Sequence, residues 1–395
     1  MTRPGRAVAL DVLRAAAILL VLGVHAPQIT AGTWGYAICQ VWQRSGWAGV
    51  DLFFALSGYL IVGLLLAERR LTGTIDVRAF AVRRVFKIYP PYLLFLAAVV
   101  GWSYGQAPGS PAQRVAATIA AFWPTLAHLQ NYIPVPAAPH LWSLAMEEHC
   151  YALMLGIVLA AGRSADPLRS RRIPMALLAL FVASWLGRWA YVIWGYPGAG
   201  PIGFAYTHNR LDAVLAGSLA AWLVQRARFD TVGPPAAWRR GKRALVAGSA
   251  ACLVPTATLD AYAHRPLVLL GVLPLQAVGF GLMLLVLAAP LGGRSPDDRE
   301  VSRRPSWPVR VLAFIGISSY STYLWHVPFA GLLTDRATVD LSNAHPAGGL
   351  LRLAIFVAFS LGIGAVAFRL VERPALAWRR RWLARPVTVA SPVSP

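Results

Sequence analysis

The sequence has little charge and few cysteines. Only 13% of its 395 residues are charged, against about 25% in an ordinary soluble domain. The three cysteines, Cys39, Cys150 and Cys252, show neither metal-site spacing nor a disulfide framework, so no metal ligands are expected. No long polar segment interrupts the chain, and the sequence therefore excludes a separate soluble domain.

Several familiar motifs are also missing. The chain contains no P-loop, no GxSxG and no HExxH sequence, which argues against an ATP-driven pump or a zinc hydrolase. Acidic residues are scarce, 16 against 37 basic ones, so the net charge is +21. Such an excess would suggest nucleic acid in a soluble protein. Cytoplasmic loops of membrane proteins accumulate Lys and Arg as well, and we expect no nucleic-acid partner here.

Long apolar stretches recur along the whole chain. Hydrophobic residues make up 57% of it, and its mean hydropathy is +0.54. This pattern predicts an all-α, polytopic integral membrane helical bundle with ten transmembrane helices. The first apolar run is longer than that of a usual signal peptide, so it is interpreted as a retained helix. The predicted spans are 8–26, 48–66, 88–104, 141–161, 174–194, 208–225, 244–260, 267–290, 311–331 and 349–371.

The distribution of basic residues gives the orientation. With the N-terminus inside, 28 of the 37 Lys and Arg residues fall in inner segments and four in outer loops. This asymmetry predicts that both termini are cytoplasmic. The apolar segment 114–130 does not fit as a crossing, because it would invert every later loop. It is expected to be a re-entrant or interfacial helix on the outer side, broken near Pro124.

The first predicted span carries two ionisable residues, Arg14 and His25. Eleven residues separate them, which is about 1100° of rotation, so both lie on one helix face about 16 Å apart. Ionisable residues inside a span are costly and tend to face a bundle interior or a cavity. They can also serve as anchors, with Arg14 reaching the inner surface and His25 the outer headgroups.

The predicted topology sorts the other intramembrane polar groups into two levels. Each could be structural: Asp51 as a helix cap, Arg210 and Asp212 as partners in ion pairs, or His326 as a helix end. Taken together, they indicate an outer polar chamber suited to general-base chemistry and an inner basic mouth suited to phosphate. The outer level contains His25, Asp51, Glu147, Glu148, Arg210, Asp212 and His326; the inner level contains Arg14, Arg83, Arg84, Lys87 and Glu372.

Six short motifs, in order along the chain, resemble those of acyltransferase family 3, a family of bacterial integral membrane proteins. They are Arg14 with His25, the GVDLFFALSGYLI run at 49–61, the basic stretch 83–90, the segment 142–151, the RLDAVLAG segment 210–217 and the SYSTYLWH segment 319–326. Two positions depart from the family pattern. Lys87 stands where Arg is usual, which puts bidentate phosphate binding in doubt, and Cys150 replaces Phe.

The resemblance implies transfer of an acyl group, often acetyl, from cytoplasmic acyl-CoA to a sugar hydroxyl. No permanently bound cofactor is expected. The acceptor would be a surface polysaccharide, a lipid-linked glycan or a glycosylated natural product. The expected roles are catalysis for His25, Glu147 and Arg14; binding of acyl-CoA for Arg14, Arg83, Arg84 and Lys87; and acceptor binding for Asp51, Ser57, Glu148, Arg210, Asp212, Tyr320 and His326.

Two other functions remain open at this point. A transporter or flippase for a glycan or lipid would also need intramembrane charges, although no inverted repeat is present. A structural membrane-assembly protein would leave those charges unexplained. Residues 1–372 are expected to form the transmembrane acyltransferase domain and 373–395 a short basic cytoplasmic tail. The enzyme is expected in the bacterial inner membrane, acting alone or passing its acyl group to a partner.

Overall fold

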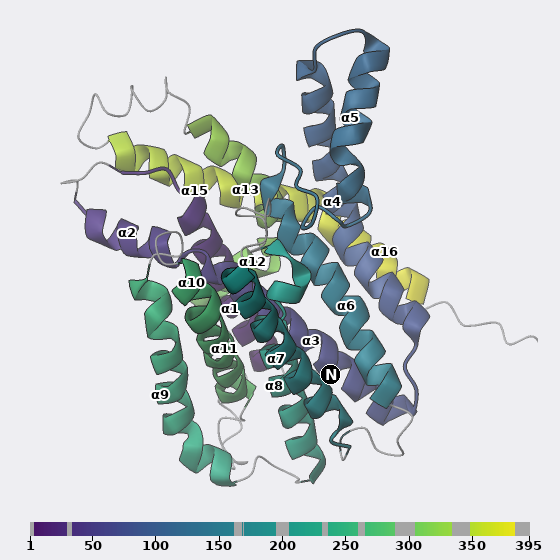
Figure 1. Ribbon diagram of the computed structural model, residues 1–395, viewed down its shortest axis with the longest axis vertical. Helices are drawn as coiled ribbons and strands as arrows, with labels where there is room; N and C mark the ends of the chain where they lie inside the picture. The colour runs from purple at the N-terminus through teal and green to yellow at the C-terminus, as the bar shows by residue number, and fades with distance from the viewer. Residues whose placement is uncertain are drawn as a thin grey trace, which may run out of the picture.

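The computed structural model describes residues 4–29, 34–161, 168, 170–194, 205–230, 236–259, 265–288, 305–333 and 348–383, and these residues form helices without a strand (Figure 1). The helices form one elongated bundle, and the prediction of an all-α fold is confirmed. The main helices are α1 (Pro4–His25), α2 (Tyr36–Ser45), α3 (Ala48–Thr72), α4 (Val77–Gln106), α5 (Pro111–Leu126), α6 (Trp142–Ala161), α7 (Arg172–Trp194), α8 (Asp212–Asp230), α9 (Ala236–Thr258), α10 (Arg265–Leu267), α11 (Leu273–Ala288), α12 (Trp307–Ile317), α13 (Ser319–Leu333), α15 (Gly348–Ala367) and α16 (Arg373–Leu383).

Seven helical segments of the described part are long and apolar enough to cross a membrane. They correspond to the predicted spans that begin at 8, 48, 88, 141, 174, 267 and 349. The other three predicted spans fall on α8, on α9, and on α12 together with α13, and none of these helices is among the seven. A multi-pass membrane bundle is therefore shown, while the number of ten crossings stays a prediction.

The centre of the bundle is the pair α3 and α8, which pack closely along their lengths. A Cβ added to Gly58 of α3 would lie 2.1 Å from the carbonyl oxygen of Val214. A Cβ added to Gly217 of α8 would lie 2.0 Å from the carbonyl oxygen of Ala55. Small residues of this kind allow two helix backbones to approach in membrane proteins. The packing of α1 and α6 against α3 then completes the core.

The predicted continuous span 311–331 is divided in the structure. Helix α12 ends at Ile317 and α13 begins at Ser319. The hydroxyl of Ser318 donates a hydrogen bond back to the carbonyl of Phe314, 3.0 Å away. Serine side chains compete with the backbone for such carbonyls, which favours a helix boundary. Both short helices pack against α1.

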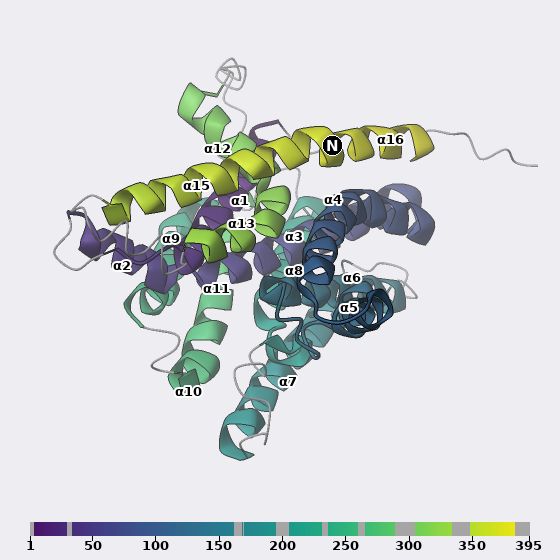
Figure 2. The same ribbon diagram turned by 90° about the horizontal axis from the view of Figure 1, so that it is seen from above.

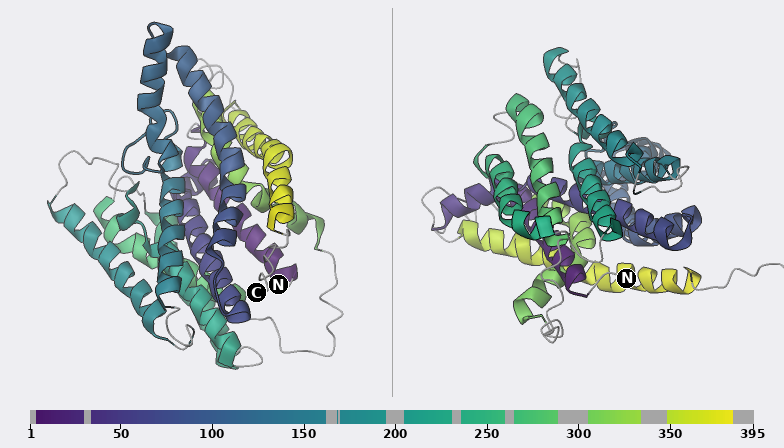
Figure 3. Two further views of the ribbon diagram at one scale, coloured as in Figure 1. Left: turned by 90° about the vertical axis from the view of Figure 1, so that its right-hand side faces the viewer. Right: turned by 90° about the horizontal axis from the view of Figure 1, so that it is seen from below.

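Helices α4 and α5 form an antiparallel hairpin that projects beyond the other helices, at the top of Figure 1 and of the left view in Figure 3. Helix α5 begins with a capping box, in which Ser110 and Gln113 each bond the other's backbone. It continues through Pro124 and ends at Leu126, close to the predicted break. The chain then returns to the bundle through an irregular stretch and the 3₁₀ turn η1 (Pro139–Leu141).

The last described helices continue one another. Between α15 and α16 lies the π-helical stretch η6 (Phe368–Glu372), and Figure 2 shows the three as one long rod along the bundle. The part of the predicted tail that the structure describes, 373–383, is thus helical. It packs on α4, where the rings of Phe86 and Trp378 meet edge to face at 5.5 Å.

Candidate active site

Three histidines from three elements meet beside the end of α1. His25 ends α1, His140 lies in η1, and His326 lies in α13. The ring centroids of His25 and His326 are 4.7 Å apart, and those of His140 and His326 are 5.3 Å apart, both edge to face. His326 is fully buried and His140 nearly so, whereas His25 is partly exposed. His25 is therefore the ring of this histidine cluster that a substrate can reach.

Proline at position 328 explains how His140 is held. A proline has no N–H group, so the carbonyl one helical turn earlier has no partner within the helix. That carbonyl belongs to Leu324, and its oxygen lies 3.1 Å from Nε2 of His140. Since a carbonyl can only accept a hydrogen bond, His140 is the donor through Nε2–H. The helix interruption at Pro328 thus creates the attachment point for η1.

A second contact ties η1 to α13. The hydroxyl of Tyr323 donates to the carbonyl of His140 at 2.8 Å and lies 2.5 Å from the hydroxyl of Ser143. All three residues are buried. The start of α6 is therefore fixed relative to α13, the helix that carries His326.

Glu147, on α6, has partners other than His25. It accepts hydrogen bonds from the hydroxyls of Ser57 and Tyr151. The hydrogen bonds described for His25 lead instead to Val21 and His326. A direct contact between Glu147 and His25 is not among the described ones, and the catalytic role of Glu147 stays a prediction.

Tyr151 connects the two predicted levels. Its hydroxyl donates to Glu147, which the topology placed at the outer level, and the guanidinium of Arg84 lies over its ring at 4.9 Å. Arg84 was assigned to the inner mouth. The neighbouring carboxylate of Glu148 has a buried oxygen, Oε1, without a hydrogen bond among the described residues. The outer and inner groups thus form one connected region along α6.

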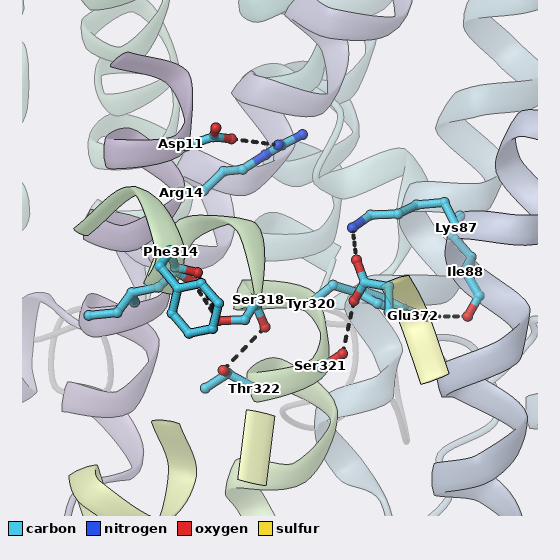
Figure 4. Close-up of polar contacts among 11 residues, drawn as sticks. Asp11, Arg14, Lys87, Ile88, Phe314, Ser318, Tyr320, Ser321, Thr322 and Glu372 are labelled. Atoms are coloured by element: carbon cyan, nitrogen blue, oxygen red, sulfur yellow. Dashed lines mark hydrogen bonds and ion pairs between the residues drawn. The ribbon is translucent and has the colours of Figure 1, made fainter. Parts of the chain in front are cut away.

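The inner cluster holds carboxylates as well as cations (Figure 4). Lys87 is paired with Glu372, which also accepts a hydrogen bond from Ser321 at 2.9 Å. Tyr320 donates to the carbonyl of Ile88 at 3.0 Å. Glu372 is fully buried in η6, where a π turn widens the helix. This carboxylate therefore joins α4, α13 and the C-terminal helix.

Two more of the predicted phosphate-binding cations already have acidic partners. Arg14 pairs with Asp11 at 3.2 Å, and Arg83 pairs with Glu68 at 2.8 Å. A phosphate would have to compete with these carboxylates for the same N–H donors. Among the four predicted cations, only Arg84 has no salt bridge within the described residues.

A groove of about 420 Å³ lies between α12 and the C-terminal helix. Phe314 and Ile317 line it on the side of α12. On the other side the arginines Arg369, Arg373 and Arg380 alternate with the apolar Phe368 and Leu376. The guanidinium of Arg369 lies over the ring of Phe314 at 5.2 Å. None of these arginines was among the predicted site residues, because Arg369 falls inside the last predicted span and Arg373 and Arg380 in the basic tail.

Asp51, Arg210 and Asp212 belong to a separate, buried ion-pair network. Arg210 contacts Asp51 at 2.7 Å, and Arg188 of α7 contacts Asp212 at 3.1 Å. Gln276 of α11 donates to the second oxygen of Asp51 at 2.8 Å. The network joins α3, α7, α8 and α11, and its three predicted residues keep acceptor binding only as a prediction.

An aromatic stack outside the predicted site connects the loop after α5 with the 3₁₀ turn η3 (Thr207–Asn209). The rings of Tyr132 and Tyr206 stack at 5.0 Å, and those of Tyr132 and His208 at 6.0 Å. Nearby, burial lowers the pKa of His128, with a smaller contribution from His149. The signal in the sequence was weak, since aromatic residues and histidines are spread over distant loops.

These features define a membrane-embedded helical protein with a reachable histidine and a basic cluster. A family model described as an acyltransferase domain matches residues 8–369. The chain belongs to acyltransferase family 3, as its motifs predicted.

The names of similar proteins are consistent with this family. The chain is 27% identical to the peptidoglycan O-acetyltransferase OatA of Listeria monocytogenes, over 92% of this chain and 55% of the relative. It is 26% identical to a putative peptidoglycan O-acetyltransferase of Bacillus subtilis, over 82% and 49% of the two chains. A putative O-acetyltransferase of Staphylococcus aureus is 26% identical over 96% and 60%. The chain thus spans about half the length of these curated relatives. No solved structure matches it.

Proposed function

We propose that the protein is a membrane O-acetyltransferase that moves an acetyl group from cytoplasmic acyl-CoA to a hydroxyl of a carbohydrate acceptor. One observation carries the proposal: His25, the reachable ring of the histidine cluster, ends the first span of an acyltransferase. The acceptor class is supported by the names of the relatives, two of which refer to peptidoglycan. Membership of this family favours an enzyme over a transporter or flippase.

His25 is the proposed catalytic base. A neutral imidazole can remove the proton of an acceptor hydroxyl as that hydroxyl attacks the acetyl carbonyl, and such catalysis is typically worth 10²–10⁴-fold. The partial exposure of His25 suits this role, because a base has to touch its substrate. Glu147, with Ser57 and Tyr151, is proposed to lie on the acceptor side and to act together with Glu148.

Arg84 is the proposed main contact for the phosphates of the donor. Its guanidinium has no described salt bridge, in contrast to Arg14, Arg83 and Lys87, which are paired. The groove lined by Arg369, Arg373 and Arg380 offers further cations in η6 and α16, at the C-terminal end of the described chain. Arginine suits phosphate because it presents several N–H donors in a planar fork. We place this end at the cytoplasmic face of a bacterial inner membrane, with both termini inside.

The test is acetyl-CoA turnover by purified protein in the presence of peptidoglycan fragments, measured as release of free CoA. His25→Gln should reduce turnover at least about 100-fold, with unchanged membrane insertion and melting temperature. The matched control is His208→Gln, the same exchange at an exposed ring of the aromatic stack. Wild-type turnover by His25→Gln would remove His25 from the mechanism. Absence of turnover in the wild type with every hydroxyl acceptor offered would reject the enzyme class proposed here.

A further inference from the structure

The two ring nitrogens of His326 have different roles. Nδ1 lies 2.6 Å from the carbonyl oxygen of Tyr323. A carbonyl oxygen accepts hydrogen bonds and cannot donate them, so Nδ1 of His326 carries a proton. In the neutral ring, the other nitrogen, Nε2, is then an acceptor.

This acceptor faces His25. Nε2 of His326 is 3.3 Å from Nδ1 of His25, which is also 3.1 Å from the carbonyl oxygen of Val21. Both neighbours of this nitrogen are acceptors, so the proton of the neutral His25 ring belongs on Nδ1. The lone pair is left on Nε2, the nitrogen that the described hydrogen bonds do not use.

We propose that His326 is a positioning residue for His25, which holds its proton on Nδ1 and leaves Nε2 free to act as the base. The inference rests on the proposed function, because it assigns the reacting atom of the proposed base. It gives His326 a role other than the expected contact with the acceptor, and the full burial of this ring supports that role.

His326 adds something that the Val21 carbonyl does not supply. The Val21 carbonyl belongs to the same helix as His25, one turn earlier, and moves with it. His326 approaches from α13, edge to face at 74°, and so fixes the plane of the His25 ring relative to a second helix. When His25 accepts a proton, its Nδ1–H becomes a charged donor, and hydrogen bonds from charged donors are stronger. The contact therefore favours the protonated form that arises during transfer.

The position of His326 is itself supported on two sides. Its Nδ1–H is anchored to Tyr323 within α13, and the ring of His140 packs against it. His140 is anchored to Leu324 through the carbonyl that Pro328 leaves without a helical partner. Buried rings with fixed hydrogen bonds cannot turn to another tautomer without losing a bond. The histidine cluster is thus an ordered chain that ends at Nε2 of His25, the partly exposed ring.

The first experiment compares three variants of α13 by acetyl-CoA turnover. His326→Phe removes the acceptor and should lower kcat about 10–100-fold, as is typical when an outer partner of a functional imidazole is lost, with KM for acetyl-CoA and acceptor unchanged. His326→Gln retains an oxygen acceptor of similar reach and should recover most of kcat. Thr322→Val, an isosteric change at a buried neighbour, is the control and should leave both constants unchanged.

Equal losses in His326→Phe and His326→Gln would overturn the positioning role, as would a rise in acceptor KM with constant kcat, since that result would place His326 at the acceptor. If His326→Phe does not fold, the comparison of His326→Gln with Thr322→Val still tests the positioning role. A residue that only fills space would gain nothing from the oxygen acceptor that Gln retains.

The second experiment observes the tautomer directly. The protein is labelled with ¹⁵N-histidine, and the His25 signals are assigned by difference from His25→Gln. At a pH where His25 is neutral, we expect the proton on Nδ1; a proton on Nε2 would overturn the assignment. This readout is independent of turnover. If His25→Gln kept its activity while wild-type His25 showed the Nδ1–H form, the proposed function of His25 would fail and the geometry would stand.

Discussion

Two buried polar clusters differ in how their polar groups are compensated, although their predicted members were placed at a single level. In the ion-pair network, Arg210 faces Asp51 and Arg188 faces Asp212, and all four are almost completely buried. In the histidine cluster, each of the three rings bonds to a backbone carbonyl, and His25 and His326 also bond to each other. One of these rings, His25, is partly exposed, and its Nε2 is left available.

The difference separates structural from chemical use of polar groups. A buried ion pair is costly to form and stabilises little, but the loss of one partner leaves an uncompensated charge. Such a pair holds helices in register without offering a free group. Imidazole rings bonded through one nitrogen keep the other for reaction. Depth in the membrane alone does not distinguish these uses; the partners of each atom do.

The largest effect should follow from breaking the ion-pair network. Arg188→Met leaves Asp212 unpaired and should destabilise the fold by about 3–5 kcal/mol, seen as a strongly lowered melting temperature in detergent. Arg44→Met, the same exchange at an exposed arginine, is the control. The double variant Arg188→Met with Asp212→Leu should recover much of the loss. An unchanged melting temperature in the single variant would mean that this network is not structural.

The next effect concerns Glu147, whose described hydrogen bonds lead to Ser57 and Tyr151 and to neither cluster. Glu147→Gln keeps the shape of the side chain but removes the charge that Ser57 and Tyr151 face, and turnover should fall about 100-fold at constant melting temperature. Ser57→Ala is the companion variant and should cost less, because it removes one donor and leaves the carboxylate. A parallel loss of melting temperature in Glu147→Gln would move Glu147 to the structural group.

A smaller effect distinguishes paired from unpaired cations. Arg84→Gln should raise KM for acetyl-CoA about tenfold, which corresponds to one charged hydrogen bond of about 1.5 kcal/mol. Arg83→Gln is the matched control, because Arg83 is engaged by Glu68. Double replacement of Arg373 and Arg380 by Gln tests the groove separately. An equal rise in Arg83→Gln and Arg84→Gln would show that salt bridges do not decide which cation binds the donor.

The smallest predicted effect is a change of turnover and melting temperature in opposite directions. Pro328→Ala returns an N–H to α13, which can recapture the Leu324 carbonyl and release His140. Turnover should fall about fivefold, equivalent to one hydrogen bond of about 1 kcal/mol, while the melting temperature rises slightly. Val327→Ala is a neighbouring control that leaves Pro328 in place. A gain in turnover would contradict the supporting role of the histidine chain.

The positions of the long helices were easier to predict from the sequence than helix boundaries and short helices. Within the described residues, helices overlap each of the ten predicted spans, because long apolar runs are local signals. The boundary at Ser318 was missed, since the apolar pattern continues across it, and α2 was missed because Tyr36–Ser45 is short and mixed in polarity.

Residues of the candidate site could be named from the sequence, but their contacts could not. His25 and His326 were both singled out from the sequence, yet their contact joins positions 301 residues apart. Local periodicity does not encode which helices are adjacent. The anchoring of His140 depends on a missing N–H at Pro328, which can be interpreted only once η1 is seen beside α13.

The π-helical stretch η6 has a consequence for phase. One residue added to a helical turn rotates everything after it by about 100° relative to an uninterrupted α-helix. In this phase Trp378 faces Phe86 on α4, while Arg373 and Arg380 face the groove beside α12. Deleting one residue from η6 would restore the regular turn and carry every later side chain to a different face. The length of this stretch therefore determines which arginines line the groove.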